Sequence, residues 1–154
     1  MKNLAEITTH SVQTPSGRIA YAEAGSGPVA LFVHGVLLNK YLWRHQMVDL
    51  ADIRRVIAVD LLAHGDTEIA PDQDVSVTAN ANMLREFLDA LKIDKVDLIG
   101  NDSGGGISQI FAGEQSGAGQ DIDADRMRRP QRLAARSFQP IRRNDEGWWS
   151  EGHA

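Results

Sequence analysis

The residues best suited to chemistry lie in a turn that begins at Gly100. The chain there reads Gly-Asn-Asp-Ser-Gly-Gly, directly after the short, mainly apolar run Val96–Ile99. A segment with helical character follows from Gly105 to Ala112. Strand, sharp turn and helix in this order are typical of a nucleophile elbow, in which glycines permit the tight turn and the close approach of the helix. We therefore predict that the middle of this turn carries a nucleophile.

The positions of the glycines distinguish Asp102 from Ser103 as the nucleophile. In the pattern Gly-x-Nu-x-Gly, the nucleophile lies two residues from each glycine. Gly100 and Gly104 bracket Asp102 in this way, whereas Ser103 would need a glycine in place of Asn101. A carboxylate can attack carbon to form an ester, which water then hydrolyses. We predict Asp102 as the nucleophile, with Ser103 and a turn without chemistry as the alternatives.

A second feature lies upstream, where the unbroken apolar run Pro28–Val33 ends in His34-Gly35-Val36. A run without alternation is typical of a strand buried on both faces of a parallel sheet. The loop after such a strand can direct backbone N–H groups toward a developing oxyanion. Alone, this motif also fits a loop with an ordinary surface histidine. Between it and the elbow lies a third segment, the run Arg55–Asp60 followed by Leu61–Thr67, and the three together form a specific pattern.

The order and spacing of these segments resemble the α/β-hydrolase family over residues 8–112. The elbow aspartate, like the segment Tyr41–Arg44, is similar to the haloalkane dehalogenase and epoxide hydrolase branch. The resemblance implies an α/β fold with a mostly parallel sheet flanked by helices, a small-molecule substrate, no cofactor, and a triad of nucleophile, acid and histidine in that chain order. It also implies Asp102 as nucleophile and the backbone N–H groups of Val36 and Ser103 as the oxyanion hole.

Two positions depart from that branch. Typical dehalogenases hold the leaving halide with an Asn directly after His-Gly, a Trp directly after the nucleophile, or both, and this chain has Val36 and Ser103 there. Neither side chain supplies an amide or indole N–H. Asn39 could offer an amide nearby, although an ordinary polar loop residue is the simpler interpretation. The motif therefore predicts a hydrolase with an aspartate nucleophile, without choosing among haloalkanes, epoxides and esters.

The histidines do not provide the expected general base. Four precede the elbow and the fifth is next to the C-terminus: His10, His34, His45, His64 and His153. No spacing among them, or with Asp60, is typical of a metal site. We expect this chain to be an inactive fragment of hydrolase ancestry, with a serine esterase-like hydrolase or a non-catalytic gene remnant as the alternatives.

The composition changes abruptly at Gly113, which divides a core (1–112) from a tail (113–154). The 42 tail residues hold only three Ile or Leu, seven arginines, seven acidic residues and no lysine. Because no period of 2 or 3.6 runs through them, we expect an irregular tail and a bare far edge of the sheet. The balanced charge argues against a nucleic-acid-binding arm. Back-translated and read one base later, Gly113–Phe138 can encode a helix end, a proline and a strand, which predicts a frameshift near Gly113.

Other patterns predict the elements that position the site. Strand alternates with helix, which is typical of a parallel sheet. We predict an opening hairpin from His10–Gln13 and Ile19–Ala22 and a helix over Tyr41–Leu50. An amphipathic helix should pack on the sheet through an apolar stripe made of Met83, Leu84, Phe87, Leu88 and Leu91.

The composition of the chain limits the classes of molecule that it is expected to bind. The net charge of -5 and a pI near 5.5 disfavour nucleic acids and anionic membranes. There is no cysteine, no apolar run of ~18 residues, and no signal-peptide pattern at Met1–Ala5. We predict a cytoplasmic protein without metal or cofactor, and leave its oligomeric state open.

Overall fold

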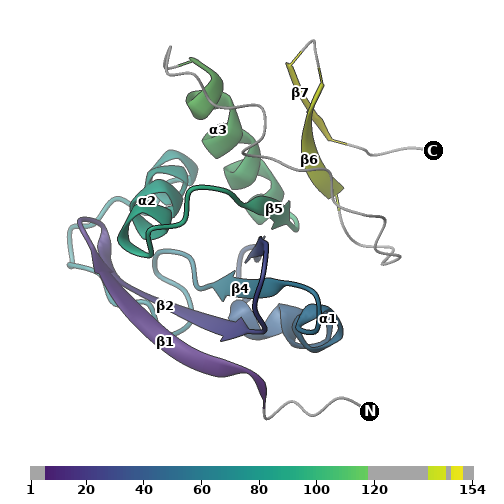
Figure 1. The fold of residues 1–154 in the computed structure, drawn as a ribbon. Coiled ribbons are helices and arrows are strands. Elements are labelled where there is room, and N and C mark those ends of the chain that lie inside the picture. Colours follow the sequence, from purple (N-terminus) through teal and green to yellow (C-terminus); the bar gives the residue numbers. More distant parts are fainter. Residues whose placement is uncertain (1–5, 118–138, 145–146, 151–154) are drawn as a thin grey trace.

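The computed structural model describes residues 6–117, 139–144 and 147–150, with side chains through residue 113. Its elements alternate between strand and helix along most of the chain (Figure 1). The strands and helices, in chain order, are β1 (Thr8–Thr14), β2 (Gly17–Ala24), β3 (Val29–Val33), η2 (Lys40–Trp43), α1 (Arg44–Leu50), β4 (Arg55–Val59), α2 (Val77–Ala90), β5 (Asp97–Gly100), α3 (Ser103–Gly117), β6 (Gln139–Asn144) and β7 (Gly147–Ser150).

The strands form one sheet in the order β1-β2-β4-β3-β5-β6-β7. The central strands β4, β3 and β5 are parallel, as predicted, and β3 lies between the other two. Antiparallel pairs flank this centre, because β2 pairs with β4 on one side and β6 pairs with β5 on the other. The sheet is therefore parallel where β3 and β5 end side by side and mixed at its edges. Parallel neighbours bring the loops at their carboxyl ends together, and here those are the loops after Val33 and Gly100.

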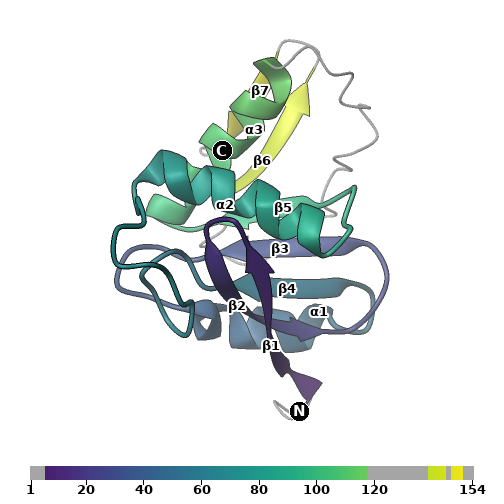
Figure 2. The same cartoon turned by 90° about the vertical axis from the view of Figure 1, so that its left-hand side faces the viewer.

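Helices cover both faces of the sheet, with α2 and α3 on one face and α1 on the other (Figures 1 and 2). The unbroken apolar runs explain this layering, because successive strand side chains point to opposite faces. On β3, Leu31 and Val33 pack in the cluster under α2 and α3, whereas Ala30 and Phe32 pack in the cluster with α1. The predicted strand buried on both faces is confirmed.

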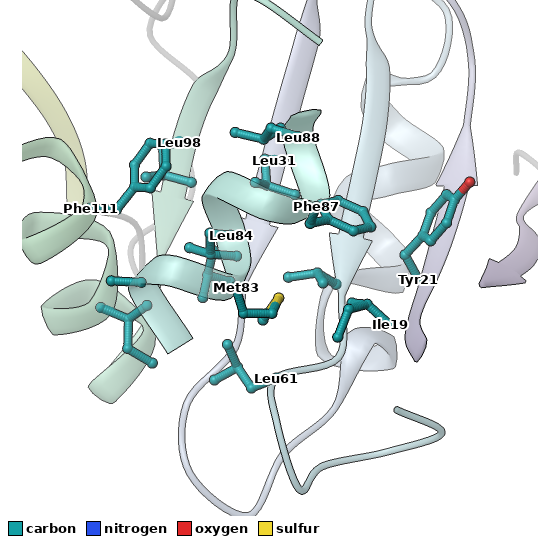
Figure 3. Packing of buried hydrophobic residues seen from close by; sticks show 14 of the residues in the cluster. Ile19, Tyr21, Leu31, Leu61, Met83, Leu84, Phe87, Leu88, Leu98 and Phe111 are labelled. Atoms are coloured by element: carbon teal, nitrogen blue, oxygen red, sulfur yellow. The ribbon is translucent and has the colours of Figure 1, made fainter. Parts of the chain in front are cut away.

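Helix α2 buries the first four residues of the predicted stripe against the sheet (Figure 3), whereas Leu91 follows the helix as its C-cap and is only partly buried. Met83, Leu84 and Phe87 are fully buried there, Leu88 is nearly so, and the Phe87 ring meets the Tyr21 ring edge-on at 5.2 Å between centroids. The Ser76 hydroxyl begins this helix by accepting a hydrogen bond from Ala79 N. The hairpin is also confirmed and is longer than predicted, as β1 and β2 show. The predicted helix over Tyr41–Leu50 is divided into the 3₁₀ turn η2 and the helix α1.

The tail prediction needs correction where the structure describes it. Helix α3 continues past residue 112 to Gly117. Strands β6 and β7 pair with each other, so the irregular tail is wrong for these two segments. The sheet edge is not bare either, because β6 pairs with β5 at Ile99 and Gly100. Backbone hydrogen bonds need no apolar periodicity, which is why composition missed these strands. The rest of the predicted tail, 118–138, 145–146 and 151–154, lies outside the described residues.

Candidate active site

Asp102 lies in the turn between β5 and α3, as predicted. Its φ angle is 53°, a left-handed conformation that costs a non-glycine residue energy and is concentrated at functional sites. The bracketing glycines permit this turn. A Cβ on Gly100 would lie 2.5 Å from Gly104 O, and one on Gly104 would lie 2.3 Å from His34 O. Only glycine therefore allows α3 to start this close to the ends of β3 and β5.

The Asp102 side chain lies against the His-Gly loop. A Cβ on Gly35 would be 2.8 Å from Asp102 Oδ2 and 2.9 Å from Asp102 Cβ. Gly35 thus makes room for the carboxylate, and the residue itself remains exposed to solvent. Two motifs far apart in the sequence therefore meet at one carboxylate.

The two predicted oxyanion donors, Val36 and Ser103, are neighbours, but one is already engaged. Val36 N donates a hydrogen bond of 2.9 Å to Ser103 Oγ. The Ser103 N–H lies at the N-terminus of α3, where helical N–H groups lack intrahelical acceptors, and it has no acceptor among the described residues. The sequence did not predict the contact through the Ser103 side chain, because it depends on a rotamer and on a loop 67 residues away.

The two histidines near this loop hold backbone groups. His34 is fully buried, its Nδ1 lies 2.7 Å from Gly35 O, and its Nε2 accepts a hydrogen bond from Leu61 N. Burial lowers the pKa of His34, which favours the neutral ring. His64 Nε2 accepts from Leu37 N at 3.3 Å, and the His34 and His64 ring centroids are 5.2 Å apart. Among the described residues, neither ring has a hydrogen bond to Asp102 or Ser103.

A buried ion-pair network holds the segment after β3 against the segment after β4. Lys40 and Asp60 are 1% and 0% exposed, and Lys40 Nζ lies 2.6 Å from Asp60 Oδ2 and 2.6 Å from Asp66 Oδ2. Burial alone would lower the pKa of Lys40, but the hydrogen bonds to both carboxylates outweigh it and raise that pKa. In turn, the hydrogen bond that Asp66 accepts from Lys40, together with the positive charge of Lys40, lowers the pKa of Asp66. The sequence places Asp60 in a motif, and the one sign of this network in the sequence is a charged residue, Lys40, in a mainly apolar segment.

The remaining candidates have local roles. Asn39 Oδ1 accepts a hydrogen bond from Tyr41 N and caps η2, as expected of a polar loop residue. His10 lies on β1, where its ring packs on Tyr21, and His45 lies on the exposed side of α1.

In the part of the chain that the structure describes, no cluster of His, Asp or Glu could hold a metal ion. Within the same residues, no helix is long and apolar enough to cross a membrane.

The chain is similar to known proteins in sequence and in fold. A soluble epoxide hydrolase of Corynebacterium sp. is 37% identical over 107 residues, covering 70% of this chain and 37% of the relative. A haloalkane dehalogenase of Mesorhizobium japonicum is 34% identical over 131 residues, covering 84% of this chain and 38% of the relative. The crystal structure of an epoxide hydrolase from Vigna radiata superposes with a TM-score of 0.70 at 28% identity, covering 74% of this chain and 38% of that one.

The chain therefore spans between 28% and 38% of the length of such curated relatives. The model of a protein family described as "alpha/beta hydrolase fold" matches residues 28–124, which include the His-Gly loop, the segment after β4 and the elbow. This chain belongs to the α/β-hydrolase fold family.

Proposed function

We propose that this chain carries the nucleophilic half of a hydrolase in which Asp102 attacks carbon of a small organic substrate. The observation that carries the proposal is the position of Asp102, in a left-handed turn with its carboxylate against Gly35. Such strain persists where the surrounding structure holds it, and it is concentrated at active sites.

In the proposed reaction, one carboxylate oxygen of Asp102 forms a bond to an electrophilic carbon. The bond from that carbon to the leaving atom breaks, and its electron pair leaves as halide or as an alkoxide that takes a proton from water. Water then attacks the carbonyl carbon of the Asp102 ester and loses a proton to solvent, so that the tetrahedral intermediate places negative charge on an Asp102 oxygen. When this intermediate collapses, the bond from the carbonyl carbon to the substrate-bearing oxygen breaks, the alcohol leaves with a proton from solvent, and the Asp102 carboxylate is restored. The N–H groups of Val36 and Ser103 are the proposed donors to that oxygen.

The surroundings of Asp102 support an apolar substrate. The loop after β3 exposes the large hydrophobic side chains of Val36, at 55%, and Leu37, at 90%, and the following turn η2 exposes Tyr41 at 46%. Small-molecule sites are lined mainly by such groups, with a few polar atoms that orient the ligand. The relatives named above include both an epoxide hydrolase and a haloalkane dehalogenase. We propose epoxides and haloalkanes as the substrate classes, and a cytoplasmic location.

A serine esterase that uses Ser103 is the alternative. A serine nucleophile needs a base within hydrogen-bond reach of its hydroxyl. Ser103 Oγ instead accepts from Val36 N, and among the described residues no histidine has a hydrogen bond to it. This arrangement favours Asp102.

The hydrogen bonds of the histidines also predict that the chain as given hydrolyses no substrate through repeated turnovers. Hydrolysis of the ester needs an activated water, and the two histidines nearest the elbow are engaged with backbone groups. We therefore propose a single alkylation event that stops at the ester, and retain the frameshift near Gly113 as the proposed origin of the tail.

The test is covalent trapping. The 154-residue chain is incubated with styrene oxide, hexyl bromide or nitrophenyl acetate, and adducts are located by intact mass and peptide mapping. We expect one adduct on Asp102 from the epoxide or the bromide, absent in Asp102→Asn and present in Ser103→Ala. An acetyl group on Ser103, with no adduct on Asp102, would support the serine esterase instead.

A further inference from the structure

The Val36 N–H, a proposed oxyanion donor, is not free in this structure, because it donates to Ser103 Oγ at 2.9 Å. We propose that the Ser103 hydroxyl occupies this donor in the resting chain and rotates away when the Asp102 ester is hydrolysed, whether by activated water or by hydroxide. Ser103 is thus a positioning residue that controls the second chemical step. The inference rests on the function proposed above.

The geometry explains why the Ser103 hydroxyl oxygen and the charged oxygen of the Asp102 intermediate compete for the Val36 N–H. Ser103 directly follows Asp102 in the chain, and Asp102 Oδ2 lies beside Gly35, the residue before Val36. An oxyanion donor works at about 2.7–3.1 Å from its oxygen, and Ser103 Oγ is at such a distance from Val36 N. The hydroxyl oxygen therefore stands at the N–H group that the charged oxygen of the Asp102 intermediate would use.

The two hydrogen bonds that the Val36 N–H can donate differ in strength, and this difference allows the oxyanion to displace the Ser103 hydroxyl. A hydrogen bond from an amide to a neutral hydroxyl is roughly half as strong as one to a charged oxygen. The oxyanion therefore displaces the hydroxyl when charge develops, but the lost bond slows the step by up to about tenfold. Serine has one side-chain torsion with three staggered positions, so it can move away without a change in the backbone.

Two substitutions at Ser103 give opposite expectations. Ser103→Ala removes the competing hydroxyl and leaves Val36 N–H free, so the Asp102 ester should hydrolyse about three- to tenfold faster. Ser103→Thr keeps the hydroxyl on a stiffer, β-branched side chain, so its ester should decay at the wild-type rate or more slowly. The matched control is Ser11→Ala, because the Ser11 hydroxyl also accepts a 2.9 Å hydrogen bond, from Arg18 Nε, on the exposed β1–β2 hairpin.

The experiment separates ester formation from ester decay. The full chain and the three variants are alkylated with styrene oxide, freed of reagent, and followed by intact mass at mildly alkaline pH, where hydroxide hydrolyses the ester. We expect faster decay of the ester in Ser103→Ala alone, and both ester formation and ester decay within about twofold of wild type in the control Ser11→Ala. A structural defect would instead slow formation.

The outcomes distinguish this inference from the proposed function. Decay in Ser103→Ala at or below the wild-type rate would overturn the role of Ser103 and leave Asp102 as the nucleophile. If wild type forms no ester on Asp102, both proposals fail together.

Discussion

Gly35 and Asp102 lie so close that a single methyl group between them would collide with the carboxylate. A Cβ on Gly35 would be 2.8 Å from Asp102 Oδ2, a separation that real Cβ atoms essentially never show. Gly35 is 67 residues from the nucleophile in sequence and has no reactive group, yet it determines where the carboxylate can stand. The His-Gly motif and the elbow are in this sense one site.

This contact predicts that Gly35→Ala displaces the Asp102 carboxylate and slows its alkylation. A misplacement of about 1 Å can cost roughly a hundredfold in rate, so we expect a loss of about 10- to 100-fold. The rate of adduct formation with styrene oxide measures it. Gly106→Ala is the control, because no atom lies within 4 Å of a Cβ there and the helix α3 should tolerate alanine. Equal rates in the two variants would show that the Gly35 contact does not position the nucleophile.

The Lys40–Asp60 pair predicts a large loss of stability when one partner is removed. Lys40→Met leaves the buried Asp60 carboxylate without its cation, which typically costs about 3–5 kcal/mol in the free energy of unfolding. Asp66→Asn should cost much less, because the Asp66 side chain is 77% exposed and solvent screens it. Urea unfolding followed by circular dichroism measures both. A Lys40→Met variant as stable as wild type would mean that the pair does not hold this loop.

The same lysine predicts a weakening of the fold at high pH. Its pKa in the folded state is raised above the ordinary value of 10.5, so folding favours the charged ammonium group. This contribution is complete below about pH 10.5 and is lost as the pH rises through the higher folded-state value. Urea midpoints measured between neutral and strongly alkaline pH should fall in wild type and change less in Lys40→Met.

Burial of His34 predicts a loss of stability in mild acid. Its folded-state pKa is lowered from 6.5, so the unfolded chain binds this proton first as the pH falls. The contribution is complete above about pH 6.5 and then declines by up to about 1.4 kcal/mol per pH unit. His34→Gln, which retains a donor and an acceptor for Gly35 O and Leu61 N, should show a flatter profile between pH 7 and about pH 5. If the stability of wild type and of His34→Gln fell equally with decreasing pH, groups other than His34 would cause the loss of stability in acid.

The sequence predicted those parts of the fold that follow from local patterns. An unbroken apolar run predicted β3, the stripe from Met83 to Leu91 predicted α2, and the glycines predicted the elbow, because each depends on neighbouring residues. The contacts that complete the site depend on long-range geometry. Ser103 Oγ meets Val36 N through a rotamer choice, and Lys40 meets Asp60 through a loop in which Leu37 adopts a φ of 62° without being glycine. Neither leaves a periodic signal.

The fate of oxygen from water shows whether Asp102 is the nucleophile. The styrene oxide adduct is formed in ordinary water and then hydrolysed by hydroxide, at mildly alkaline pH, in water enriched in the heavy isotope ¹⁸O. If Asp102 forms the ester, water attacks its carbonyl carbon, so the label should enter the Asp102 carboxylate and the released diol should carry none. Label in the diol, with none in the peptide that contains Asp102, would mean that no Asp102 ester is hydrolysed at its carbonyl carbon.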